Sequence, residues 1–264
     1  MQKKITHTLG STTGLTQDDQ FEVNVYTKSS NIFSVYLDNE ITDMQDFRGA
    51  VQVMSMAGPD DTVNVYLNTP GGSVFGAMGF LHAANDCQAE ITYHASGSIA
   101  SAGAIILSSA DNFSISPHAE VMYHTATGGS YGTLNQSEKQ AAFRKKNIRA
   151  FIDFHCAGIL TRAELEVMHE NNVEYYFTSD EFVDRWKRKQ ACKEMIVDLV
   201  DDGELNPQDV KSGAYTELML NLTDAYIEQQ SKPKKRTSRA KKPSQCSNSC
   251  CNIVTGKQIG RAHV

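Results

Sequence analysis

Short runs of alternating or β-branched apolar residues recur along the first half of the chain and predict strands. These runs cover residues 32–37, 63–67, 91–95, 113–115 and 120–123. Between them, apolar residues at helical spacing predict helices over 44–56, 74–86 and 102–110. Strands that alternate with helices through short connections are typical of an α/β fold.

The second half of the chain is predicted to be mainly helical. A long helix is expected over 134–160, a second over 161–171 with Thr161 and Glu164 as a capping box, and further helix over 189–230 with a break at 203–207. The long helix carries apolar residues on one side and five basic residues on the other, namely Lys139, Arg144, Lys145, Lys146 and Arg149. Its simplest interpretation is a surface helix packed on its own domain.

These patterns divide the 264 residues into four segments. Residues 1–30 are polar and turn-rich, 31–188 form the α/β domain, and 189–230 form a helical C-terminal extension. Residues 231–264 are basic and then rich in Ser and Cys, without the periodicity of a core, so we expect disorder there. The last seven residues, 258–264, resemble the translation of a common sequencing adapter.

The composition is that of an ordinary soluble protein, with 40% hydrophobic and 21% charged residues. The chain lacks both an apolar run long enough for a transmembrane helix and the apolar stretch of a signal peptide, so we expect a cytoplasmic protein without membrane contact. Of the six cysteines, those at 87, 156 and 192 are expected to act as small core residues. The tail cysteines at 246, 250 and 251 lack the partners of a spaced metal site, so no metal is expected.

The net charge of -6 combines an acidic body with a basic tail. Seven Lys or Arg residues lie within residues 232–242, whereas the chain before residue 232 has 16 basic and 31 acidic residues, a balance of -15. An acidic body argues against a dedicated nucleic-acid enzyme, and the tail is expected to be a solvated segment.

The chemistry of the chain centres on Ser101, which lies in the small-residue segment 97–104 between a predicted strand and a predicted helix. A serine followed by a small residue and Gly suits a sharp strand-to-helix turn that exposes its hydroxyl. A serine hydroxyl is a weak nucleophile until a base accepts its proton. His124, 23 residues later, directly follows a predicted apolar strand and is the best candidate for that base, ahead of four other histidines, His82, His94, His118 and His155.

A Pro-Gly-Gly turn precedes the serine by 29 residues, counted from Gly72. Glycine allows the backbone to approach a substrate closely, so this turn offers an exposed N–H. Two such donors would stabilise the negative charge of a tetrahedral intermediate, which is often the largest single contribution to catalysis.

Three segments, 68–73, 98–104 and 121–124, resemble the signature motifs of the Clp proteolytic subunit family of serine peptidases, in the same order and at the same spacing. The resemblance implies the spiral of strand-strand-helix units shared with crotonases. It further implies Ser101 as the nucleophile, His124 as the general base, and the backbone N–H groups of Gly72 and Ala102 as the oxyanion hole.

The acid of the triad is the weakest part of the resemblance. The family has an Asp just before an aromatic stretch that leads into a helix, and the matching position here is Glu174. Asp180 and Asp184 are alternatives, although Asp180 is already explained as a first-turn residue of a helix capped by Thr178 or Ser179. The family's usual ending of this region is also absent, and the run 185–189 of basic residues and Trp186 stands near it.

The resemblance implies an endopeptidase that acts on unfolded polypeptides inside stacked heptameric rings of identical subunits and requires no cofactor. It also implies an AAA+ unfoldase partner, and it makes the long helix the handle that joins two rings. Four alternatives remain open: a Ser–Lys peptidase with Lys139 as base, a scaffold whose triad has decayed at Glu174, a crotonase-type enzyme without a nucleophile, and a phage protein that processes capsid components.

Overall fold

The computed structural model describes residues 30–43, 47–128, 133–206 and 214–231. The predicted polar segment 1–30, except residue 30, lies outside the described residues, as do the tail from residue 232 onward and its cysteines. The peptidase-like region and most of the C-terminal extension are described.

Six strands form one sheet in the order β1-β2-β3-β5-β6, and β4 pairs with β3 beside this path. The strands are β1 (Ile32–Leu37), β2 (Thr62–Thr69), β3 (Glu90–Ala100), β4 (Asn112–Ile115), β5 (Glu120–Tyr123) and β6 (Tyr175–Thr178). All pairs are parallel except β5 with β6, which is antiparallel. The long strand β3 pairs with β4 along its first half and with β5 near its end.

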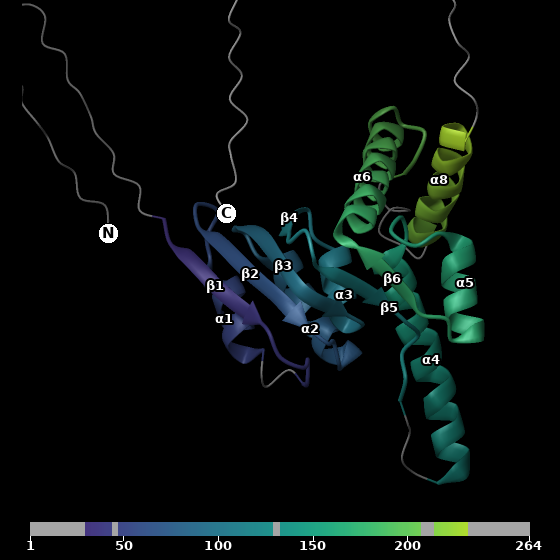
Figure 1. Cartoon of the computed structure of the whole chain (residues 1–264), viewed down its shortest axis with the longest axis horizontal. Helices are drawn as coiled ribbons and strands as arrows, with labels where there is room; N and C mark the ends of the chain where they lie inside the picture. The colour runs from purple at the N-terminus through teal and green to yellow at the C-terminus, as the bar shows by residue number, and fades with distance from the viewer. Residues whose placement is uncertain (1–29, 44–46, 129–132, 207–213, 232–264) are drawn as a thin grey trace, which may run out of the picture.

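Helices cover the sheet and extend from it (Figure 1). They are α1 (Arg48–Met56), α2 (Val74–Asp86), α3 (Ala102–Ser108), α4 (Leu134–Cys156), α5 (Arg162–Asn171), α6 (Ser179–Asp201) and α8 (Ala214–Ser231). Helices α6 and α8 lie side by side, and α4 projects away from the sheet (Figure 1). None of the described helices has the length and apolar character needed to cross a membrane. The α/β class predicted from the sequence is confirmed.

Alternation along β2 shows how the core forms. Val63, Val65 and Leu67 are at most 1% exposed, whereas Tyr66 between them reaches the surface. A period of two places one set of side chains on each face of a strand, so three residues of this strand enter the core together. Tyr66 instead stacks with Tyr36 of β1 and His94 of β3 on the outer face.

Several predicted boundaries differ from the structure. Strand β3 continues to Ala100, because its final residues pair with β5. Helix α4 ends at Cys156, and a short turn that contains Gly158 at φ 92° separates it from α5. The aromatic segment before α6 forms strand β6, in which Tyr176 is 55% exposed.

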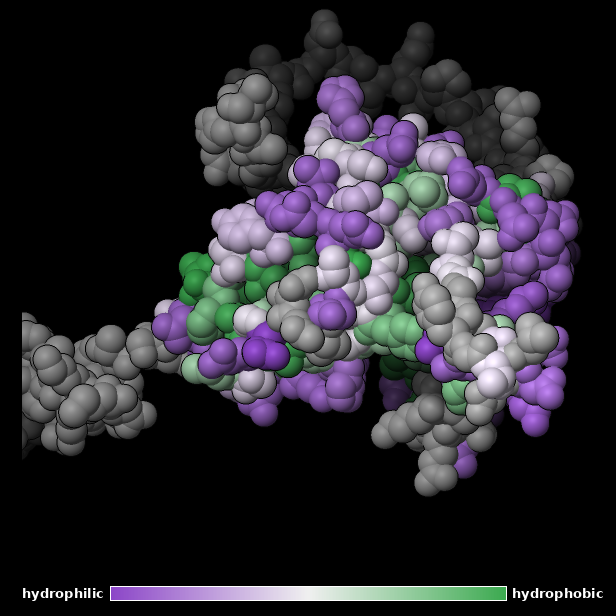
Figure 2. Space-filling model, turned by 90° about the horizontal axis from the view of Figure 1, so that it is seen from below, coloured by the Kyte–Doolittle hydropathy of each residue, from purple (hydrophilic) through white to green (hydrophobic). Residues whose placement is uncertain are grey.

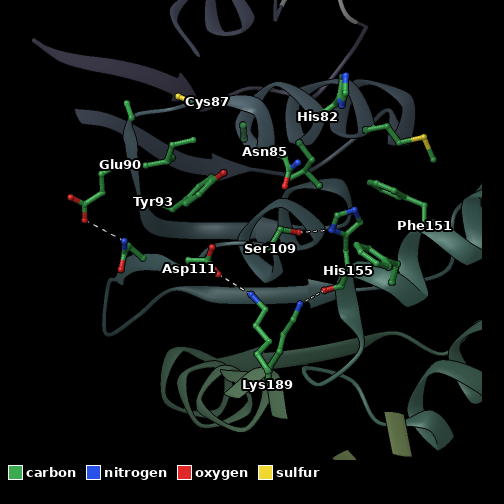
Figure 3. Close-up of a pocket in the computed structure, with 18 of the residues that line it drawn as sticks. His82, Asn85, Cys87, Glu90, Tyr93, Ser109, Asp111, Phe151, His155 and Lys189 are labelled. Atoms are coloured by element: carbon green, nitrogen blue, oxygen red, sulfur yellow. Dashed lines mark hydrogen bonds and ion pairs between the residues drawn. The ribbon is translucent and has the colours of Figure 1, made fainter. Parts of the chain in front are cut away.

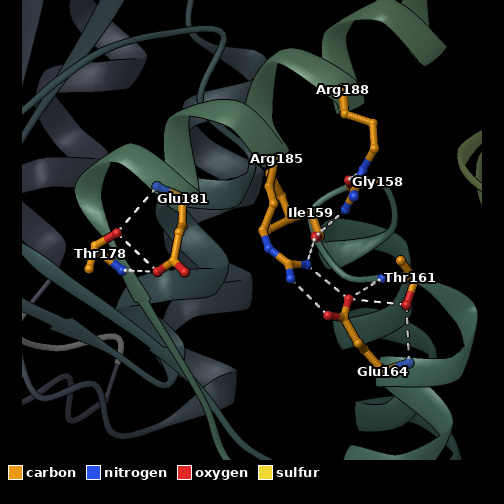
Figure 4. A network of polar contacts seen from close by, with 8 residues as sticks. All are labelled: Gly158, Ile159, Thr161, Glu164, Thr178, Glu181, Arg185 and Arg188. Atoms are coloured by element: carbon orange, nitrogen blue, oxygen red, sulfur yellow. Dashed lines mark hydrogen bonds and ion pairs between the residues drawn. The ribbon is translucent and has the colours of Figure 1, made fainter. Parts of the chain in front are cut away.

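Helix α6 runs without interruption across residues 188 and 189, where the sequence placed the start of a separate extension. It begins with a capping box in which Thr178 and Glu181 satisfy each other's backbone N–H groups. A second, predicted capping box, of Thr161 and Glu164, starts α5. Figure 4 shows Arg185 between the two, donating to both carboxylate oxygens of Glu164 and to the Ile159 carbonyl.

Lys189 of α6 is buried and donates to the carbonyl of Ser108, 2.8 Å away. It also donates to the carbonyl of His155, 2.5 Å away (Figure 3). These carbonyls lie at the C-terminal ends of α3 and α4. The last carbonyls of a helix have no N–H partner within the helix itself. A cation is favourable at a helix C-terminus. Lys189 therefore joins the ends of two helices to a third.

Burial changes the ionisation of this region. It lowers the pKa of Lys189 to about 7, and a smaller contribution in the same direction comes from Lys193. Burial, with the nearby Lys189 charge, lowers the pKa of His155 to about 4. At neutral pH the imidazole of His155 is neutral.

The shift of Lys189 predicts a pH-dependent stability. The unfolded chain keeps the proton of this lysine up to its ordinary pKa of 10.5, whereas the folded protein releases it above about 7. Because the unfolded state then binds more protons, the free energy of unfolding rises with pH, by at most about 1.4 kcal/mol per pH unit. We expect the wild type to gain stability over Lys189→Met between pH 7 and pH 9 in urea titrations.

The matched control is Lys187→Met, which removes an exposed lysine from the same helix. This variant should follow the pH dependence of the wild type. Parallel stability curves for the wild type and Lys189→Met would contradict the predicted linkage.

Candidate active site

Ser101 occupies the turn between β3 and α3, with φ 55° and ψ -120°. A non-glycine residue rarely adopts a positive φ, and such strain is concentrated at functional sites. The turn is fixed by a backbone hydrogen bond of 2.8 Å from the Ser101 N–H to the carbonyl of Met122 in β5. Its side chain is half-buried, and the N–H groups of the first turn of α3 point out of the helix end.

His124 directly follows β5, the strand beside the end of β3. Its Nε2 lies 2.7 Å from Oγ of Ser101, within hydrogen-bond distance. The two residues come from strand ends that the pairing of Ala100 with Met122 places side by side. The structure therefore brings together the predicted nucleophile and the predicted base.

The Pro-Gly-Gly turn after β2 packs directly against the serine turn. A Cβ on Gly71 would lie 2.5 Å from the Ala100 carbonyl oxygen and 2.6 Å from the Cβ of Ser101. Ile41 fixes the other side, because it donates to the Gly71 carbonyl and accepts from the N–H of Ser73. In such a parallel bridge the N–H of the intervening Gly72 points away from Ile41. Gly72 and Ser101 line the same cavity.

Glu174 directly precedes β6, as His124 directly follows β5. The last pair of the antiparallel register is Tyr123 with Tyr175, and one further step in the same direction would place His124 opposite Glu174. Opposed residues of an antiparallel pair share one face of the sheet. The carboxylate, however, accepts a 2.7 Å hydrogen bond from the hydroxyl of Tyr176, and no hydrogen bond joins it to His124 within the described residues.

Asp180 lies in the first turn of α6, beyond Thr178. Thr178 pairs with Glu120, at the opposite end of β5 from His124. Glu120 and His124 are four residue steps apart along the strand direction, roughly 13 Å. The register therefore keeps Asp180 away from His124. Its negative charge in the first turn of α6 is explained by its favourable interaction with the helix N-terminus.

A second serine–histidine pair lies outside this site. Oγ of Ser109 is 2.7 Å from Nδ1 of His155, the same separation as in the first pair (Figure 3). The Ser109 hydroxyl donates its proton to the Ile105 carbonyl, so it accepts from Nδ1–H of His155. With the hydroxyl proton directed at this carbonyl, His155 is the donor of the pair, which lies at the C-terminal end of α3.

A cavity of about 680 Å³ opens beside Ser101 and His124. One wall consists of the serine and glycine turns and residues 124–128, and the other of α4 with His169 of α5. His169 is buried, and its Nε2 lies 2.8 Å from Oδ1 of Asp153 in α4. The two residues lie on different helices and 16 positions apart, so no local pattern of the sequence predicted this pair.

Comparison with known proteins identifies the family. The model of the Clp protease family matches residues 17–184, more than half of the chain. The ATP-dependent Clp protease proteolytic subunit 2 of Corynebacterium diphtheriae is 27% identical over 190 residues, which are 70% of this chain and 89% of that protein.

Two subunits named ATP-dependent Clp protease proteolytic subunit 1 match over shorter regions. The subunit of Salinibacter ruber is 29% identical over 40% of this chain, and that of Rhodococcus jostii is 32% identical over 46%. The chain spans about half the length of each, 48% and 57% respectively. With the fold and the three motifs, the family match shows that this chain belongs to the Clp protease family.

Proposed function

We propose that the protein is a serine endopeptidase that hydrolyses unfolded polypeptides. The observation that carries the proposal is the 2.7 Å contact between Oγ of Ser101 and Nε2 of His124 at a strained strand-to-helix turn. Nε2 accepts the hydroxyl proton as Oγ bonds to the peptide carbonyl carbon. The carbon–nitrogen bond then breaks, and His124 returns the proton to the leaving amine. Water releases the acyl group by the same route.

The oxyanion of the tetrahedral intermediate is assigned to the backbone N–H groups of Gly72 and Ala102. Ala102 is the first residue of α3, so its N–H has no partner within the helix. The Gly72 N–H points away from Ile41, and the glycine turn packs on the serine turn. Two donors held by rigid backbone need little reorganisation as charge develops.

Glu174 is assigned as the acid that orients His124 and stabilises its charged form. One further step of the β5–β6 register would place Glu174 opposite His124, which supports this role. In this structure its carboxylate accepts a hydrogen bond from the Tyr176 hydroxyl. The longer side chain of Glu, compared with Asp, allows the carboxylate to rotate between the two partners. A scaffold protein with a decayed triad is the alternative that Glu174 leaves open. The tests below distinguish this inactive scaffold from an active peptidase.

We further propose that the protein forms stacked rings of identical subunits, with seven subunits a ring, and receives substrate from an AAA+ unfoldase in the cytoplasm. Helix α4 supports the assembly, because it projects from the body and carries Phe143, which is 65% exposed (Figure 1). A large apolar residue in such a position favours contact with another subunit. The names of the matched relatives include ATP dependence, which supports the partner.

Labelling with a fluorophosphonate tests the nucleophile. We expect mass spectrometry to find a single adduct on Ser101 and none in Ser101→Ala, and peptide hydrolysis to disappear in the variant with the fold retained. Ser109→Ala is the matched control, since this serine has a histidine at the same distance. It should keep the adduct on Ser101. Absence of any adduct in the assembled protein would favour the scaffold.

Substitution of Glu174 tests its role as the acid of the triad. Glu174→Gln should lower kcat by about 10³-fold or more, because a neutral amide does not stabilise a charged imidazole. Asp180→Asn should leave kcat within about twofold, since it lies at the far end of the strand pair and acts on the helix terminus. Equal losses in the two variants, or a larger loss in Asp180→Asn, would contradict the assignment.

The glycine turn can be tested by adding one methyl group. Gly71→Ala places a Cβ 2.5 Å from the Ala100 carbonyl oxygen, so the oxyanion turn must shift away from Ser101. We expect kcat to fall by about 10²-fold or more. Gly49→Ala is the control, because its Cβ meets nothing within 4 Å. Full activity in Gly71→Ala, with the fold verified by circular dichroism, would contradict this role for the turn.

A further inference from the structure

The cavity beside the proposed nucleophile has an uneven distribution of charge. Three basic residues of α4 line it, Arg144, Lys145 and Arg149, and no Asp or Glu is among the described residues of its lining. Seen from below, hydrophilic residues cover the side of the molecule on which α4 and α5 lie (Figure 2). The cavity therefore presents a cationic wall to whatever enters it.

One of the three cations already has partners. Arg149 lies 2.6 Å from an oxygen of Glu170 and 3.8 Å from one of Asp153, which also contacts His169. These contacts form a network that connects α4 and α5. Arg149 is therefore explained by the fold.

Arg144 and Lys145 differ from Arg149. Neither forms an ion pair with another residue in the part of the chain that the structure describes, and Arg144 is half-buried. Lys145 lies near enough to Glu170 to contribute to the lowering of its pKa, after Arg149. Because neither cation is ion-paired within the described residues, both remain available to an anionic group that enters the cavity.

The helical spacing places one charged residue and two apolar residues in a single row on α4. Arg144, Ile148 and Ile152 are four residues apart, so they form one row along α4, and all three line the cavity. Ile152 is buried, and Ile148 and Arg144 are both partly exposed. The cavity beside Ser101 thus has both an apolar floor and a cationic end.

We propose that this cavity selects acidic polypeptide segments, with a substrate carboxylate held by Arg144 and Lys145. The proposal rests on the proposed peptidase function and names its substrate class. Guanidinium groups bind carboxylates through paired hydrogen bonds, and an ammonium adds a compact charge. Glu, whose carboxylate follows two methylene groups, matches an apolar floor with a cationic end.

Matched peptides test the proposal. Decapeptides carrying Glu, Gln or Lys in turn at each of the three positions before the scissile bond differ only in charge at that position. We expect one position at which the Glu peptide exceeds the Gln peptide by about tenfold in kcat/KM, which corresponds to ~1.4 kcal/mol, and at which the Lys peptide is poorest. High salt should reduce the difference.

Variants of α4 locate the effect. The double variant Arg144→Gln, Lys145→Gln should lose most of the preference for Glu over Gln, and Arg144→Glu should shift the preference toward Lys. The matched control is Lys146→Gln, an exposed lysine of the same helix that does not line the cavity. It should keep the full preference. Equal rates for Glu and Gln peptides, or an equal loss in Lys146→Gln, would overturn the proposal.

Binding separates this proposal from the peptidase function. Fluorescence anisotropy of the same labelled peptides with Ser101→Ala measures selection without hydrolysis. Tighter binding of the Glu peptide, lost in the triple variant that adds Arg144→Gln and Lys145→Gln, supports the acidic preference even if turnover is absent. Equal binding of the Glu and Gln peptides overturns it, whereas absence of turnover and of labelling at Ser101 counts against the peptidase.

Discussion

The backbone hydrogen bond from Ser101 to the carbonyl of Met122 is the interaction on which the site depends. It continues the pairing of β3 with β5 by one step beyond Ala100. Parallel strands end at the same edge of a sheet, so the chain leaves β3 at Ser101 and β5 at His124 on neighbouring strands. A slip of one residue would turn His124 to the other face. The register, rather than any side-chain contact, determines that serine and histidine meet.

The same register accounts for what the sequence could predict. The apolar strands, the short helix after Ser101 and the histidine after β5 are local patterns, and the structure has them at nearly the predicted residues. Strand β6 was missed, because the sequence of Tyr175–Thr178 lacks an alternation of apolar and polar residues and the strand is held by its pairing with β5. Whether Glu174 contacts His124 depends on a side-chain rotation that no pattern of residue types encodes.

Basic residues were the least predictable part of the chain. The run 185–189 resembles a solvated charged surface, yet Arg185, Arg188 and Lys189 donate to main-chain carbonyls at helix ends and in the turn before α5. Their acceptors lie between about 26 and 81 positions earlier in the chain. Long-range partners of this kind leave no local signal. On α4, by contrast, Arg144 has no carboxylate partner among the described residues. We propose that this arginine binds a substrate carboxylate, whereas Arg185 and Arg188 hold the fold together.

Lys189 also determines when the fold can be completed. It reaches the ends of α3 and α4 from the middle of α6, so these carbonyls receive their partner only from a residue that follows both helices in the chain. During synthesis, the strands, the serine turn and α4 all leave the ribosome before it does. The C-terminal end of α3, the helix that begins directly after Ser101, therefore gains its lysine partner only once the middle of α6 has emerged.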